Sequence, residues 1–186
     1  MFHVRRRCRR RGFTLAELMA VVAIVAVMGA IAMATLSGAG NGQNAAGLAR
    51  SLEFAMMGAR AAAISDGFVR RIHCNLQTSG SWCSVDRATT AGAAPTAWTT
   101  ESTVRANSHA TVWAVTASTD VTAQTPAQAS GDRYVYVKTD GSVGDATNST
   151  TGATFYVSDS GGTNTANRYK VYVYSATGMP RLVNQW

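Results

Sequence analysis

A basic segment followed directly by a long apolar segment constrains the fold of this chain more than any other feature. Residues 1–11 contain six arginines and no acidic residue, and residues 13–36 contain a single charged residue, Glu17. As an α-helix rising about 1.5 Å per residue, the apolar segment is about 36 Å long. That exceeds the roughly 30 Å hydrocarbon core of a bilayer. Because arginines stay on the cytoplasmic side, we expect residues 13–36 to cross a membrane.

Glu17 breaks the apolar pattern. A carboxylate inside an apolar helix costs on the order of 2.5–3.5 kcal/mol in a membrane unless a partner offsets it, so such a residue is a candidate for function. It lies in the segment Gly12-Phe13-Thr14-Leu15-Ala16-Glu17-Leu18-Met19. This segment, placed after a short basic leader, resembles the prepilin signal of type IV pilins and of type II secretion pseudopilins.

The resemblance implies roles for three residues. Prepilin peptidase, a membrane aspartyl protease, would cut between Gly12 and Phe13, and Phe13 would then be N-methylated. Glu17 would pair with the terminal amine of an adjacent subunit during filament assembly. The implied partners are other major and minor pilins, the peptidase and an inner-membrane assembly platform. The implied location is the inner membrane, single-pass with a periplasmic head, and then the pilus at the cell surface.

Two other export signals are alternatives. Ala30-Ile31-Ala32 and Ala32-Met33-Ala34 both fit the small-residue cleavage site of an ordinary secretory signal peptide. Residues 10–15 loosely fit a twin-arginine signal. Neither alternative gives Glu17 a role, and the apolar segment is longer than the core of an ordinary signal peptide. The pilin signal therefore explains more of the residues.

The net charge of the whole chain is misleading. Its formal value of +7 would favour a nucleic-acid-binding protein. Removing residues 1–12 leaves 11 basic and 10 acidic residues, so the mature chain carries about +1. The remaining 43–186 region is long enough for one core, and it is rich in Thr, Ser, Gly and Ala. This composition is typical of an exported β-rich domain.

Glycines interrupt the helical pattern after the apolar segment. Gly38, Gly40 and Gly42 each weaken a helix by about 1 kcal/mol relative to alanine. A hinge or local melting is therefore expected at residues 37–42.

Helical periodicity resumes after this segment, with apolar residues recurring at spacings of three and four. The recurring residues are Leu48, Leu52, Ala55 or Met56, Ala59 and Ala63. The pattern predicts an amphipathic helix that ends near Asp66-Gly67, where glycine suits a helix C-cap. We expect its apolar stripe to pack on a sheet, with a coiled-coil partner as the alternative.

Strand signals fill the rest of the chain. The expected strands are residues 68–74, 82–85, 111–115, 133–138, 154–158 and 168–174. The first two should be antiparallel, Asp140-Gly141 indicates a hairpin, and the last two should pair around Gly161-Gly162. Residues 86–110 and 116–131 are expected to be long loops or weak edge strands.

The order of these elements predicts an α+β fold, in which a long N-terminal helix packs on an antiparallel β-sheet domain, as in pilins. The expected organisation is a cleaved leader (1–12), a transmembrane and filament-core helix (13–36), the hinge (37–42) and an α+β head (43–186).

The cysteine count changes with the proposed cleavage. Cys8 lies in the leader, so the mature chain keeps Cys74 and Cys83. An even count in an exported domain predicts a disulfide between them. Two unpaired thiols are the alternative.

No enzymatic motif is recognisable, and the sequence predicts no catalytic residue, no cofactor and no metal site. His3 lies in the leader, and neither His73 nor His109 belongs to a cluster with metal-ligand spacing. We interpret His73 as an ordinary strand residue. Residues 148–150 fit a glycosylation sequon, a pattern that is common by chance.

A second resemblance concerns the pilin branch. The passage from helix to strand over residues 59–74, followed by Trp82, resembles the branch that contains FimT, FimU and the H-type pseudopilin of type II secretion. This resemblance implies a minor pilin that primes or caps assembly of a type IV pilus. An H-type pseudopilin is the first alternative.

A DNA-binding uptake pilin is the second alternative. FimT-like uptake pilins carry a Gly-Arg-x-Arg motif near the C-terminus. Here Gly178 and Arg181 match, but Met179 replaces the first arginine. Arg168, Lys170 and Arg181 are the candidate DNA contacts, and a solvated strand end is the competing interpretation. Each lost cation weakens phosphate binding.

Overall fold

The computed structural model describes residues 15–77, 80–91, 95–106, 109–119, 126–145, 150–159, 162, 165–184 and 186, with the side chains of 29–43 left out. The chain divides into two compact units, residues 1–39 and residues 40–186. Helix α1 (Leu15–Asp66) belongs to both units.

In the first unit, the described residues are helical and strongly apolar. Nine large apolar side chains between Leu15 and Met28 are each at least 54% exposed. An apolar surface of this extent marks a contact with a membrane or with another protein. Among the residues whose side chains are described, no helix is long and apolar enough to cross a membrane.

The backbone of α1 is helical through residues 37–42, and the boundary between the two units lies in this segment, after Ala39. The expected hinge stays a prediction.

The second unit contains the amphipathic half of α1. One stripe of this helix is buried, and it contains the predicted residues Leu48, Leu52, Met56, Ala59 and Ala63. Ala45 and Ala49 extend the stripe toward the N-terminus. The helix ends at Asp66, and Gly67 follows with a φ of 71°. The amide of Gly67 donates to the carbonyl of Ala63 at 3.1 Å, which confirms the predicted C-cap.

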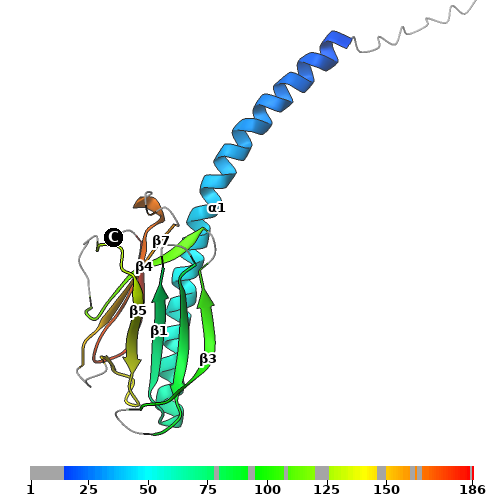
Figure 1. Cartoon of the computed structure of the whole chain (residues 1–186). Coiled ribbons are helices and arrows are strands. Elements are labelled where there is room, and N and C mark those ends of the chain that lie inside the picture. The colour runs from blue at the N-terminus through cyan, green and yellow to red at the C-terminus, as the bar shows by residue number, and fades with distance from the viewer. Residues whose placement is uncertain are drawn as a thin grey trace, which may run out of the picture. The chain divides into compact units, whose positions relative to one another are not determined.

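The described residues after α1 form nine strands, and all paired neighbours are antiparallel. Figure 1 shows how these strands lie against the second half of α1. They are β1 (Arg70–Leu76), β2 (Trp82–Ala88), β3 (Trp98–Arg105), β4 (Ala110–Thr116), β5 (Gly131–Val137), β6 (Val143–Gly144), β7 (Ala153–Asp159), β8 (Tyr169–Val173) and β9 (Pro180–Asn184), with a 3₁₀ turn η1 (Thr165–Asn167) before β8. The five-stranded sheet has the order β3-β2-β1-β5-β6, and the four-stranded sheet has the order β4-β7-β8-β9. The predicted α+β, pilin-like arrangement is confirmed.

Each predicted strand overlaps an observed one, and β3 lies inside the segment expected to be loop or weak edge strand. β3 forms the edge of the five-stranded sheet, and most of its side chains are exposed. Its threonine-rich, polar sequence has no period-two apolar signal, because an exposed edge strand buries little. The division of the strands into two sheets was not foreseen either.

Both sheets and α1 share one hydrophobic core. Phe155, Leu52, Met56 and Ile72 are among its largest fully buried side chains. Along β1, Ile72, Cys74 and Leu76 enter this core, whereas the residues between them face the other side of the sheet. The five-stranded sheet therefore presents a second, polar face outside the core.

The predicted disulfide is present. Cys74 on β1 and Cys83 on β2 lie directly opposite each other and are bonded. Both are buried in the core cluster. The bridge fixes the register of the first hairpin from its inner face.

We expect the double variant Cys74→Ala, Cys83→Ala to lose about 2–3 kcal/mol of unfolding free energy. The physical reason is that the bridge closes a loop between residues 9 apart, and even a loop of about ten residues restricts the unfolded chain by that amount. Urea unfolding of the full-length chain in detergent, followed by tryptophan fluorescence, measures the change. Equal midpoints for the variant and the oxidised wild type would contradict the expectation.

Candidate functional site

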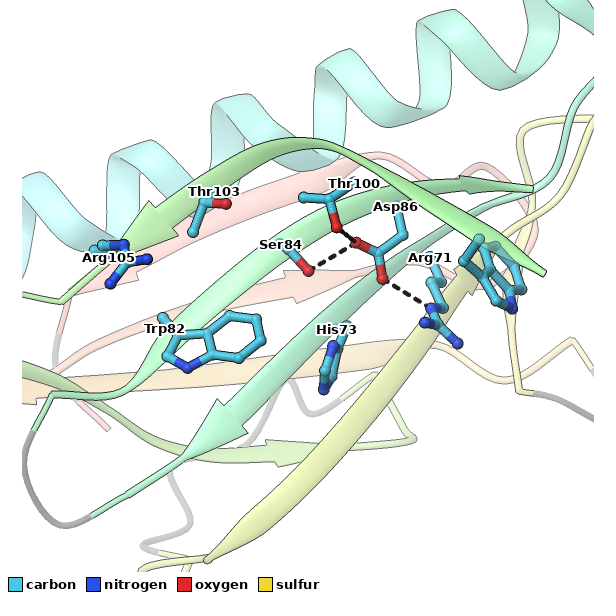
Figure 2. A pocket seen from close by; sticks show the side chains of 9 residues that line it. Arg71, His73, Trp82, Ser84, Asp86, Thr100, Thr103 and Arg105 are labelled. Carbon is cyan, nitrogen blue, oxygen red and sulfur yellow. Dashed lines mark hydrogen bonds and ion pairs between the residues drawn. The ribbon is translucent and has the colours of Figure 1, made fainter. Parts of the chain in front are cut away.

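The outer face of the five-stranded sheet carries a hollow of about 330 Å³ (Figure 2). Its lining residues come from β1, β2 and β3: Arg71, His73, Trp82, Ser84, Asp86, Trp98, Thr100, Thr103 and Arg105. On β1 the lining residues Arg71 and His73 alternate with the core residue Ile72. The alternation of side chains along the strand therefore places one set in the core and the other set in the hollow.

Asp86 is the polar centre of the hollow, and it is only 3% exposed. Its Oδ2 accepts a hydrogen bond from Arg71 Nε at 2.9 Å, and its Oδ1 accepts from Ser84 Oγ at 2.8 Å and from Thr100 Oγ1 at 2.9 Å (Figure 2). Burial alone would raise the pKa of this carboxyl, but the three hydrogen bonds outweigh burial and hold the pKa below its usual value. Asp86 is therefore a satisfied anion.

Arg71 is held by aromatic rings as well as by Asp86. Its Cζ lies 4.3 Å from the ring centroid of Trp98 and 4.9 Å from that of Tyr134, which are cation–π distances. Only its Nε is used in the bond to Asp86. Within the described residues, the two Nη groups of Arg71 donate no hydrogen bond and remain available to a ligand.

His73 forms one wall of the hollow. Its ring stacks on Tyr134 with centroids 4.6 Å apart and meets Trp82 at 75° and 5.0 Å. Its Nε2 lies 3.0 Å from Oδ1 of Asp132, an atom that also accepts from Asn75 Nδ2 at 2.7 Å. The hydrogen bonds from His73 and Asn75 hold the pKa of Asp132 below its usual value.

Ser84 lies opposite His73 in the β1–β2 register, with Asp132 bonded to that histidine. This resembles a serine–histidine–aspartate group only in composition. The hydroxyl of Ser84 donates to Asp86, a carboxylate, and His73 does not accept its proton. The arrangement thus fixes side chains in place and does not activate Ser84 as a nucleophile.

Arg105 differs from the other arginines of β1, β2 and β3. Arg70 bonds both Asp66 and Glu101, and Arg87 also bonds Asp66. The hydrogen bond from Arg70 is the main reason that the pKa of Asp66 lies well below its usual value. Arg105 is exposed and has no hydrogen-bond or ion-pair partner in the part of the chain that the structure describes. It therefore brings an unneutralised positive charge to the hollow.

The structure places the predicted N-terminal residues only in part. Gly12 and Phe13 lie outside the described residues. Glu17 lies in the first turn of α1 and is exposed. A carboxylate at this end of a helix is favoured by the helix dipole. The roles assigned to these three residues stay predictions.

The three candidate DNA contacts have different environments. Lys170 on β8 is 3% exposed. Arg168 donates from Nη2 to the carbonyl of Gly162 at 2.7 Å, and its Cζ lies 4.8 Å from the ring of Trp186. Of the three, Arg181 alone is exposed. Contact of these residues with DNA stays a prediction.

Gly178, the other residue of the C-terminal motif, has a structural reason to be glycine. Its φ is 60°, and a Cβ there would collide with the carbonyl oxygen of Gly141 in the β5–β6 turn. The adjacent carbonyl of Thr177 accepts a hydrogen bond from Arg60 Nε at 2.6 Å. Gly178 thus allows the turn before β9 to pack against the hairpin and α1.

Sequence reasoning missed the hollow. It located β1 and β2, but Trp98, Thr100, Thr103 and Arg105 all come from β3, which carried no apolar signal. The available clue was the alternation in residues 133–138, which places Tyr134 and Tyr136 on the face away from the core.

Comparison with known proteins identifies the N-terminal segment. Residues 7–33 match a family model described as the prokaryotic N-terminal methylation motif. This motif is the N-terminal region of type IV pilins and pseudopilins, and the matched segment includes Gly12, Phe13 and Glu17. Neither the curated proteins nor the solved structures contain a significant match to the chain.

We expect Asp86→Asn to cost about 1–3 kcal/mol of unfolding free energy at pH 7, because Arg71 loses its anionic partner. It should also weaken the acid dependence of stability. A carboxyl with a lowered folded pKa stabilises the fold above its unfolded pKa of about 3.9, and this stabilisation is lost as the pH falls through the folded pKa. Urea unfolding of both proteins between pH 2.5 and pH 7 measures the two effects.

Thr103→Ala is the matched control, since Thr103 lines the same hollow and does not bond to Asp86. It should keep the wild-type pH profile. A profile for Asp86→Asn as steep as that of the wild type would refute the role given to this carboxylate.

Proposed function

We propose that the chain is a minor pilin, a structural subunit that primes or caps assembly of a type IV pilus. The observation that carries the proposal is the N-terminal methylation motif of residues 7–33. It is supported by the helix that follows the motif, whose second half packs on antiparallel sheets in an α+β domain. An H-type pseudopilin of a type II secretion system has the same kind of anchor, and it is the alternative that the experiment must separate.

In this proposal, prepilin peptidase cuts between Gly12 and Phe13, and Phe13 becomes N-methylated. The apolar side chains between Leu15 and Met28 are covered by lipid in the inner membrane before assembly. They are covered by helices of neighbouring subunits in the filament. The domain of residues 43–186 lies in the periplasm and then on the pilus.

Glu17 sets the register of assembly in this proposal. It is the fifth residue of the cleaved chain, about one helical turn from the new amino group of Phe13. In an apolar filament core, a carboxylate and an ammonium group attract each other far more strongly than in water. The carboxylate of one subunit therefore selects the position at which the amine of its neighbour comes to rest.

Mass spectrometry of sheared surface filaments from the native host tests the proposal. We expect peptides from residues 50–186 together with an N-methylated Phe13 terminus. Their absence from filaments, with the processed chain left in the inner membrane, would favour the secretion pseudopilin. An unprocessed terminus, or one produced by cleavage at Ala34, would overturn the pilin interpretation.

We expect Glu17→Val to block incorporation into filaments without blocking cleavage after Gly12, because the variant keeps the apolar helix and loses the charge that pairs with the amine. Immunoblots of membrane and filament fractions measure both steps. Leu18→Val, one residue away, is the matched control and should assemble normally. Normal incorporation of Glu17→Val would show that the carboxylate does not set the register.

A further inference from the structure

The hollow on the five-stranded sheet offers more hydrogen-bond donors than acceptors. Within the described residues, no partner accepts from the Nη groups of Arg71, the guanidinium of Arg105, or the indole N–H groups of Trp82 and Trp98. Its one carboxylate, Asp86, already accepts three hydrogen bonds. A ligand that fits must therefore supply acceptors, and a negative charge among them would satisfy the arginines best.

Trp82 supplies a face for stacking. Figure 2 shows its indole broadside in the view into the hollow, with the ring of His73 beside it. In the β2–β3 register, Trp82 lies directly opposite Arg105. The sheet thus sets a broad apolar ring next to an unneutralised guanidinium, and large rigid rings of this kind bind the apolar face of a ligand at little entropic cost.

The charge around the hollow argues against a nucleic acid. Proteins that bind single strands combine several stacking rings with a continuous basic groove. Arg70 and Arg87 alternate with Arg71 and Asp86 along their strands, so they lie on the other face of the sheet, where ion pairs neutralise them. On the outer face, Asp132 adds negative charge beside His73. The two cations of the hollow, Arg71 and Arg105, suit one or two separate anionic groups and not a phosphate backbone.

We propose that this hollow binds an acidic carbohydrate, with the C–H face of one sugar ring on Trp82 and the carboxylate of that sugar on Arg105. The Nη groups of Arg71, at the opposite end of the hollow, then receive the carboxylate of the next sugar unit. A volume of about 330 Å³ is at the lower end for a small-molecule site, which suits one or two units of a longer glycan. Thr103, on β3 with Arg105, adds a hydroxyl group that can bond to the ligand. This inference is independent of the filament system to which the chain belongs.

Calorimetric titration of the full-length chain in detergent tests the proposal, with the quenching of tryptophan fluorescence as a second readout. The probes are tetragalacturonic acid, its fully methyl-esterified and therefore neutral form, and a single-stranded oligothymidylate. We expect millimolar or tighter binding of tetragalacturonic acid, at least about tenfold weaker binding of the neutral ester, and weakening of the acidic interaction as salt rises.

Variants identify the residues. Trp82→Ala should abolish binding of both sugars, whereas Arg105→Gln should weaken only the acidic one, by about tenfold, and reduce its salt dependence. Arg133→Gln is the matched control, because Arg133 is an exposed arginine on β5 of the same sheet that does not line the hollow. Thermal unfolding of each variant verifies that the sheet is intact. For Arg105→Gln, an unchanged affinity for the neutral ester is a second check.

Four results would overturn the proposal. The first is no binding of tetragalacturonic acid at about 10 mM, a concentration at which even a weak site is occupied. The second is equal affinity for the acid and the neutral ester, and the third is unchanged binding in both Trp82→Ala and Arg105→Gln. The fourth is preferential binding of the oligothymidylate. The last would assign the hollow to nucleic acid.

Discussion

Burial of one apolar stripe of α1 against two sheets is the constraint on which the rest of the second unit depends. Leu52 and Met56 are fully buried, and they share a cluster with Ile72 from the five-stranded sheet and Phe155 from the four-stranded sheet. Because side chains on a strand alternate between faces, fixing Ile72 in the core also fixes Arg71 and His73 on the outer face. The hollow is thus a consequence of core packing, and a shift of register by one residue would exchange the two faces.

The charged groups of the head mostly satisfy one another. Asp66 joins the end of α1 to β1 and β2 through Arg70 and Arg87, and Asp86 joins β1, β2 and β3 through Arg71, Ser84 and Thr100. Such ion pairs contribute little net stability, and their main effect is to hold the side chains in position. Arg105, in contrast, has no ion-pair partner among the described residues, and it lies opposite Trp82 in the β2–β3 register. The outer face of the sheet therefore carries a positive charge next to an aromatic ring.

The N-terminal segment and the head contribute different kinds of information. The methylation motif is local: it requires a basic run, a glycine, and a carboxylate at a fixed distance within an apolar helix. A short stretch of chain contains all of these, so its resemblance to the prepilin signal can be recognised from the sequence alone. The outer face of the head has no such local signature, because the residues of its hollow come from three strands between Arg71 and Arg105 and meet only across those strands.

The amino-acid pattern alone predicted the amphipathic helix and its end at Asp66, the pairing of Cys74 with Cys83 and the α+β class. It also predicted six of the strands that the described residues form. Each of these follows from a periodicity, a cap or a cysteine count that acts over a few residues. Four features became known from the fold and not from the sequence: the strands form two sheets, β3 completes one of them, Lys170 is buried, and Arg105 lies opposite Trp82. These outcomes depend on which strands pair and which face the helix covers, and that choice is made by long-range packing of the whole core.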